Sequence, residues 1–174
     1  MANFDSKHVK NVVLVGHTGS GKTTLTESML FEAGLINRRG TILDKNTVAD
    51  YTDIEHEKGK TFFSKLVYTK WKDYKINLLD TPGYDDFAGE IIGAMRVADC
   101  GLMLLNSAMG VEVGTDIIWT YTDEYKLPML LAVNHLDNEK SDFDKTVREA
   151  KAHFGNNVVV VQYPVNQGER FDAI

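Results

Sequence analysis

The chain has 174 residues, of which 43% are hydrophobic and 25% are charged, and its formal net charge is −6. This composition is typical of a globular domain and excludes a disordered chain, a collagen-like chain or a chain stabilised by disulfides. The negative net charge argues against a domain that binds a nucleic-acid backbone by itself. A single cysteine and a polar stretch at residues 1–10 predict a cytoplasmic protein without a secretory signal, and apolar runs of only strand length predict no membrane span.

The first predicted elements are a strand, a glycine-rich loop and a helix. Residues 12–15 form a valine-rich run that is typical of a buried strand, and the run ends at Gly16. From Lys22 the apolar residues recur at helical spacing as far as Gly34, which predicts a helix that ends there. Residues 35–60 lack a clean period, so we expect a polar, mobile loop of about 25 residues.

Strands and helices alternate through the rest of the chain. Residues 61–71 and 74–79 predict a hairpin, because a polar dipeptide separates two strand-like runs. Further strands are predicted at residues 101–105, 129–133 and 158–162, and a helix at about residues 112–126. Another helix is predicted to start within residues 141–144, which resemble a capping box, and Phe143, Val147, Ala150 and Phe154 lie on one of its faces. This alternation indicates an α/β fold, in which a mainly parallel sheet carries helices on both faces.

Residues 16–23 match the phosphate-binding pattern Gly-x-x-x-x-Gly-Lys-Thr, and they lie between a predicted strand and a predicted helix. Such a loop offers its backbone amides and the positive end of a helix to a phosphate anion. We expect the Lys22 ammonium to reach the β- and γ-phosphates and the Thr23 hydroxyl to bind Mg²⁺, a hard cation that prefers oxygen. The predicted phosphate-binding residues of this loop are His17, Thr18, Gly19, Ser20, Gly21, Lys22, Thr23 and Thr24.

A second motif, Asp80-Thr81-Pro82-Gly83, ends a predicted strand. An aspartate in this place can hold Mg²⁺ through a water molecule. The backbone amide of Gly83 can approach a γ-phosphate because glycine has no side chain in the way. Asp80 is therefore a predicted metal ligand, and Gly83 is a predicted phosphate-binding residue.

A third motif, Asn134-His135-Leu136-Asp137, follows the predicted strand at residues 129–133. GTPases read guanine with the pattern Asn-Lys-x-Asp, in which the aspartate accepts hydrogen bonds from the guanine N1–H and from the exocyclic amine. Adenine cannot donate both bonds, so a carboxylate in this position selects GTP. Asn134, His135 and Asp137 are the predicted guanine-binding residues, with His135 in place of the usual lysine.

The three motifs and their neighbours resemble those of the translational GTPases, in particular of the elongation factor G type. Residues 22–27, Lys-Thr-Thr-Leu-Thr-Glu, look like that family's sequence, and residues 57–61 look like its switch segment Glu-Arg-Gly-Ile-Thr. Residues 162–165 and Phe171 resemble the stretch that leads into the family's insertion. The resemblance implies that residues 1–174 are a GTP-binding domain of P-loop GTPase fold, truncated near the start of the insertion, with further domains beyond residue 174.

The same resemblance implies an activity, a cofactor and partners. A protein of this type hydrolyses GTP to GDP and phosphate with Mg²⁺, binds the ribosome, and drives the translocation of tRNA and mRNA during protein synthesis. Thr61 becomes the switch threonine, which binds Mg²⁺ in the GTP state and releases it after hydrolysis. We expect a monomer that has no membrane partner.

The sequence departs from the family where catalysis is expected. Tyr84 stands where the family usually has a histidine that positions the attacking water, and a phenol can hydrogen-bond this water but cannot carry a proton from it at neutral pH. Tyr84, Lys22 and Gly83 are therefore the predicted catalytic residues of a slow GTPase, and Tyr84 points to a paralogue. Thr18 and Lys60 replace two apolar residues, and Lys60 is either a solvated loop lysine or a cation that stabilises charge near the γ-phosphate.

Other functions fit parts of the pattern. A tetracycline-type ribosomal protection protein or a class II release factor would share this domain and differ in the domains that follow it. A GTP-binding switch with little hydrolysis would fit Tyr84. A P-loop ATP-dependent kinase would fit the glycine-rich loop, although Asp137 and residues 80–83 argue against it.

Overall fold

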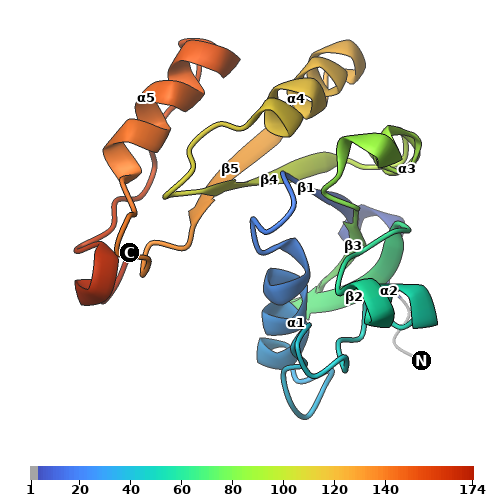
Figure 1. Ribbon diagram of the computed structural model, residues 1–174. Coiled ribbons are helices and arrows are strands. Elements are labelled where there is room, and N and C mark those ends of the chain that lie inside the picture. Colours follow the sequence, from blue (N-terminus) through green and yellow to red (C-terminus); the bar gives the residue numbers. More distant parts are fainter. Residues whose placement is uncertain (1–3) are drawn as a thin grey trace.

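A five-stranded sheet runs through the computed structural model, which describes residues 4–174 apart from the side chain of Asp85 (Figure 1). In chain order the strands are β1 (Val9–Val15), β2 (Lys65–Trp71), β3 (Tyr74–Asp80), β4 (Cys100–Asn106) and β5 (Met129–Asn134). Their order across the sheet is β2-β3-β1-β4-β5. β2 and β3 are antiparallel neighbours, which confirms the predicted hairpin, and all other neighbouring strands are parallel.

Helices cover both faces of this sheet. The helices are α1 (Lys22–Glu32), α2 (Asp53–Lys58), α3 (Ala88–Met95), α4 (Val113–Tyr125) and α5 (Phe143–Phe154), and short 3-10 turns lie at Ser6–His8, Asp85–Phe87 and Gly168–Arg170. α3, α4 and α5 pack on one face and α1 packs on the other (Figure 1). The predicted fold class is therefore confirmed. Among the described residues, no helix has both the length and the apolar character that a membrane crossing needs.

Alternating residues of the central strand β1 pack into the two layers. Val13 and Val15 belong to the core that includes Ile91 of α3, while Leu14 packs with Leu25 of α1 on the opposite face. The three β1 residues have no exposed surface. Because β1 is anchored on both faces, the position of its carboxyl end, where the glycine-rich loop begins, is fixed by the core.

The parallel arrangement brings the three sequence motifs to one edge of the sheet. β1 and β3 run side by side with Leu14 opposite Asp80, so the glycine-rich loop and the Asp80 turn follow neighbouring strand ends. β5 is parallel to β4 and ends at Asn134, where the third motif begins. The carboxyl ends of parallel strands meet at the edge where open α/β sheets bind their ligands.

The prediction of a structureless loop at residues 35–60 is wrong near its end, where α2 lies. The start of α2 carries a capping box: the Thr52 hydroxyl accepts a hydrogen bond from the Glu55 amide, and the Glu55 carboxylate accepts one from the Thr52 amide. A six-residue helix is too short to show a hydrophobic period, although its Thr-x-x-Glu spacing is visible in the sequence. α3 is likewise absent from the predicted elements, because its eight residues make only two helical turns, too few for a clear hydrophobic period.

The predicted strand at residues 158–162 does not form. The segment pairs with no strand in the described part of the chain, and the side chains of Val159 and Val161 are 76% and 77% exposed. A cavity of about 850 Å³, lined by this segment, β5 and α5, lies where strand pairing was expected. Valine-rich composition favours a strand but does not supply a partner, and the chain downstream is tied to the loop after β5 by a bond from the Gly168 amide to the Leu136 carbonyl (2.7 Å).

Candidate functional site

The phosphate loop, residues 16–21, connects β1 to α1. Gly21 adopts a left-handed conformation (φ 96°) immediately before the helix. The Lys22 ammonium turns back and donates hydrogen bonds to the carbonyl oxygens of Gly16 (2.7 Å) and His17 (3.0 Å). Burial lowers the pKa of Lys22 from 10.5 to about 8, against the attraction of the nearby carboxylates. The Lys22 ammonium is thus held against the carbonyl oxygens of its own loop.

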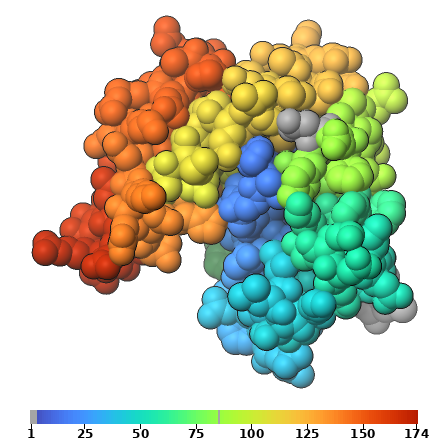
Figure 2. Space-filling model, in the orientation of Figure 1, coloured from blue at the N-terminus to red at the C-terminus, as the bar shows by residue number. Residues whose placement is uncertain are grey.

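A cavity of about 280 Å³ opens at this loop. Figure 2 shows the loop and α1 in blue at the middle of one face, flanked by teal residues on one side and orange residues on the other. Gly83 approaches so closely that a Cβ atom there would lie 2.6 Å from the Thr18 amide nitrogen and 2.7 Å from Lys22 Nζ, so only glycine fits. The predicted site residues that line the cavity are Thr18, Gly19, Gly21, Lys22, Thr23, Thr24, Thr61, Gly83, Tyr84 and His135.

Two buried carboxylates lie close to this cavity. Asp80 has no exposed surface, and neither of its side-chain oxygens has a hydrogen-bond partner among the described residues. Burial raises the pKa of Asp80 from 3.8 to about 7, although the Lys22 ammonium opposes this shift. Asp50 lines the cavity, is 4% exposed, and accepts a hydrogen bond from the Thr61 hydroxyl (3.1 Å) on one oxygen only. Burial raises the pKa of Asp50 as well, against the effect of this bond.

The oxygen atoms around Thr61 suit Mg²⁺. The hydroxyl oxygens of Thr23 and Thr61 lie 3.3 Å apart, and Thr61 also touches Asp50. Buried carboxylate oxygens without partners are costly unless a cation or a donor satisfies them, and hydroxyl and carboxylate oxygens are the ligands that Mg²⁺ prefers. The residues present, including the predicted ligand Asp80, therefore fit the ion. Asp50 joins this group although the sequence analysis did not single it out.

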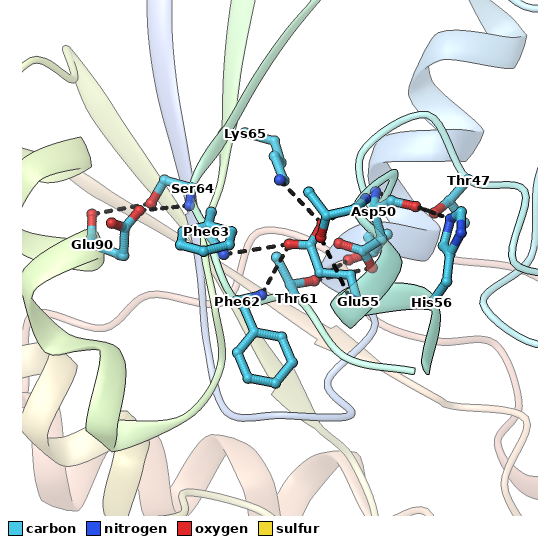
Figure 3. A network of polar contacts seen from close by, with 12 residues as sticks. Thr47, Asp50, Glu55, His56, Thr61, Phe62, Phe63, Ser64, Lys65 and Glu90 are labelled. Carbon is cyan, nitrogen blue, oxygen red and sulfur yellow. Dashed lines mark hydrogen bonds and ion pairs between the residues drawn. The ribbon is translucent and has the colours of Figure 1, made fainter. Parts of the chain in front are cut away.

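A buried polar network holds the chain next to Thr61 (Figure 3). The Glu55 carboxylate accepts a hydrogen bond from the Phe62 amide (3.1 Å) and pairs with the Lys65 ammonium (3.1 Å). Burial favours the neutral acid, but hydrogen bonds from Thr52, Phe62 and Lys65 outweigh it and hold the pKa of Glu55 below its usual range. The network thus attaches the segment before β2 to α2. The signal for it in the sequence was the capping pattern of α2.

The loop after β5 lies against the phosphate loop. The Asn134 side-chain amide donates to the Ser20 carbonyl (2.8 Å), and His135 Nε2 donates to the Gly19 carbonyl (3.0 Å). A side chain at Gly21 would collide with Asn134. The structure therefore brings two of the three predicted guanine-binding residues to the loop, while the side chain of Asp137 is exposed.

Tyr84 lies in the turn after β3 and lines the cavity. The Lys60 ammonium lies 4.4 Å from the centre of its ring. Hydrogen bonds of the phenol with Lys60 and with Thr18 hold the pKa of Tyr84 below its usual value of 10.0. Thr18, Lys60 and Tyr84, at which the sequence departs from the pattern it resembles, thus meet in one place.

Known proteins resemble this chain over most of its length. The family model of the elongation factor Tu GTP binding domain matches residues 7–171. An elongation factor G-like protein of Thermotoga maritima is 35% identical over 168 residues, and the mitochondrial ribosome-releasing factor 2 of Drosophila yakuba is 40% identical over 169 residues. Each alignment covers 97% of this chain and 24% of the relative. A crystal structure of a protein from Thermus thermophilus matches 94% of this chain and 24% of its own, with a TM-score of 0.89 and 34% identity.

The burial of Asp80 makes a prediction about stability and pH. The folded chain binds this proton up to about pH 7, whereas the unfolded chain releases it near pH 3.8, so the free energy of unfolding should fall as pH rises between these values. The total fall from this group is on the order of 4 kcal/mol. In protein freed of nucleotide and metal, Asp80→Asn should therefore be more stable than the wild type at pH 8 and similar to it near pH 4.

Urea unfolding at several pH values measures this difference, and Asp123→Asn, which removes an exposed carboxylate from α4, is the matched control. The gain in stability should come with a loss of Mg²⁺-dependent nucleotide binding. An Asp80→Asn variant that is less stable than the wild type at pH 8 would show that the carboxylate is already satisfied within the fold.

Proposed function

We propose, because this chain belongs to the family of elongation factor Tu GTP-binding domains, that it binds GTP and GDP as part of a ribosome-associated translational GTPase of the elongation factor G type. In that protein, GTP hydrolysis would drive the translocation of tRNA and mRNA during protein synthesis. The observation that carries the proposal is the cavity at which the phosphate loop, Thr61 and Gly83 meet. The chain spans about a quarter of the length of the relatives it matches, so the activity of the whole protein is part of the proposal.

A second candidate activity is the release of ribosomes, which the name of the Drosophila relative favours. Both activities would use the same nucleotide-binding domain. The difference between them would arise in parts of the protein outside residues 1–174, and it does not alter the roles of the residues in this cavity.

Residues in and beside the cavity have distinct roles in this proposal. The phosphate loop and Lys22 hold the phosphates through backbone amides and the ammonium, and the Gly83 amide contacts the γ-phosphate. Thr23, Thr61 and Asp80 would hold Mg²⁺, with Asp50 supporting Thr61. When bound, the ion would neutralise phosphate charge that the protein cations leave uncompensated.

Tyr84 is the proposed group that orients the attacking water. Its side chain lines the cavity one residue after Gly83, which is where a water in line with the γ-phosphate is expected. The phenol can donate one hydrogen bond to that water or accept one from it, but as a neutral group it adds no charge to the transition state. Hydrolysis should therefore be slow without the ribosome.

The partners follow from the same family membership. GTP, GDP and the ribosome are the proposed partners, and we propose that the protein acts as a monomer without a membrane. The single cysteine fits a reducing compartment, and we propose the cytoplasm.

The proposed selection of guanine can be tested at Asp137. In the full-length protein, GDP and GTP should displace a fluorescent guanine nucleotide and ATP should not. Asp137→Asn replaces one acceptor oxygen with a donor, so affinity for GDP should fall by about 100-fold, whereas xanthosine diphosphate, which offers an acceptor in place of the guanine amine, should gain affinity.

Asp144→Asn, which changes an exposed carboxylate in the first turn of α5, is the control and should leave both affinities unchanged. Displacement by ATP as effective as displacement by GTP in the wild type would rule out the proposed function.

The role of Tyr84 can be tested by single-turnover GTP hydrolysis on ribosomes. Tyr84→Phe should slow hydrolysis by about 10-fold or more, because it removes the hydrogen bond to water while it keeps the ring. Tyr84→His should recover only part of the rate of a histidine-bearing elongation factor, since Thr18 and Lys60 surround the new imidazole with polar groups. Equal rates for the wild type and Tyr84→Phe would show that the hydroxyl has no role.

A further inference from the structure

A cation from the segment before β2 and an aromatic ring from the turn after β3 meet at the edge of the phosphate cavity. Lys60 Nζ lies 4.4 Å from the centre of the Tyr84 ring, and both residues line the cavity with Thr18. The two residues are separated by the whole β2–β3 hairpin in the sequence. Their contact therefore joins two segments that border the place of the terminal phosphate.

The backbone of Lys60 is anchored while its side chain is exposed. Its amide donates to the Glu55 carbonyl (3.3 Å), at the point where α2 ends with Gly59 in a left-handed conformation (φ 62°). Thr61, the next residue, touches Thr23 at the proposed metal site. The long side chain of Lys60 can therefore change its direction inside the cavity while its Cα atom stays in place.

The partner of this ammonium differs from the partners of neighbouring lysines. Lys58 pairs with Glu57 (2.8 Å) and Lys65 pairs with Glu55 (3.1 Å). For Lys60, the described side chains supply the ring and the hydroxyl of Tyr84 and no carboxylate within 4.0 Å. A neutral ring and hydroxyl hold an exposed cation weakly, and a phosphate group that accepts a charge-assisted hydrogen bond is a much stronger partner.

We propose that Lys60 is a substrate-binding residue that moves its ammonium from the Tyr84 ring to the terminal phosphate of the bound nucleotide, and thereby favours GTP over GDP. This inference rests on the proposed function, because it concerns the same cavity. The γ-phosphate is expected beside Gly83, the residue before Tyr84, so it comes next to the ring on which the ammonium rests. GDP has no phosphate in that position and leaves the contact between Lys60 and Tyr84 undisturbed.

The test compares the affinities of the full-length protein for Mg²⁺ with GDP and for Mg²⁺ with a non-hydrolysable GTP analogue, measured by calorimetry. Lys60→Gln removes the charge and keeps much of the length of the side chain. It should weaken binding of the analogue by about 10-fold, the loss expected of one charge-assisted hydrogen bond, and change GDP binding by less than about twofold. Lys60→Arg should keep most of the preference for the analogue, because it keeps the charge.

Lys58→Gln is the matched control, since Lys58 is an exposed lysine two residues away and is not in the cavity lining. It should change neither affinity. Equal affinity changes for both nucleotides in Lys60→Gln, or no change in either, would overturn the assignment of Lys60 while the proposed function stands. A wild-type protein that binds neither guanine nucleotide would overturn the proposed function itself.

Discussion

The burial of Lys22 and Asp80 near one another is the constraint on which the rest of this site depends. Lys22 is 6% exposed and Asp80 is not exposed at all. The ammonium donates to two carbonyls of its own loop, whereas the described residues offer no hydrogen bond to the carboxylate. An ionised carboxylate without hydrogen-bond donors costs free energy in a protein interior, so the ionised form of Asp80 destabilises the fold when no cation is bound. A phosphate anion would pair with the Lys22 ammonium, and a divalent cation would pair with the Asp80 carboxylate.

Thr61 connects this part of the site to a segment that is far from it in the sequence. Its hydroxyl lies against Thr23 of α1 and donates to Asp50, and the chain beyond it is held by the buried pair of Glu55 and Lys65. A buried ion pair adds little net stability, but a change that removes one partner leaves an isolated charge, so the pair fixes where the segment lies. A few polar contacts therefore connect the proposed metal site to α2.

The sequence predicts those parts of the site in which chemistry dictates the residue type at the end of a strand. Residues 16–23 and Asp80 are recognisable because the proposed binding of phosphate and Mg²⁺ needs these residue types, and parallel pairing of β1 with β3 brings them together. Asp50 and α2 are not found in this way, because their positions depend on contacts with other parts of the chain, such as the bond from the Thr61 hydroxyl to Asp50 (3.1 Å) and the ion pair of Glu55 with Lys65 (3.1 Å). The valine run at residues 158–162 misleads for a related reason: composition favours a strand, but a strand also needs a partner.

In the proposed function, Thr61 couples the segment before β2 to the nucleotide and its metal. Hydrogen exchange of the amides in residues 40–64 of the full-length protein measures this coupling. Protection should be greatest with Mg²⁺ and a GTP analogue, lower with Mg²⁺ and GDP, and lowest in EDTA. Thr61→Val, which keeps the shape but removes the hydroxyl, should abolish the difference between the two nucleotides. Equal protection in all three states, or an unchanged difference in Thr61→Val, would contradict it.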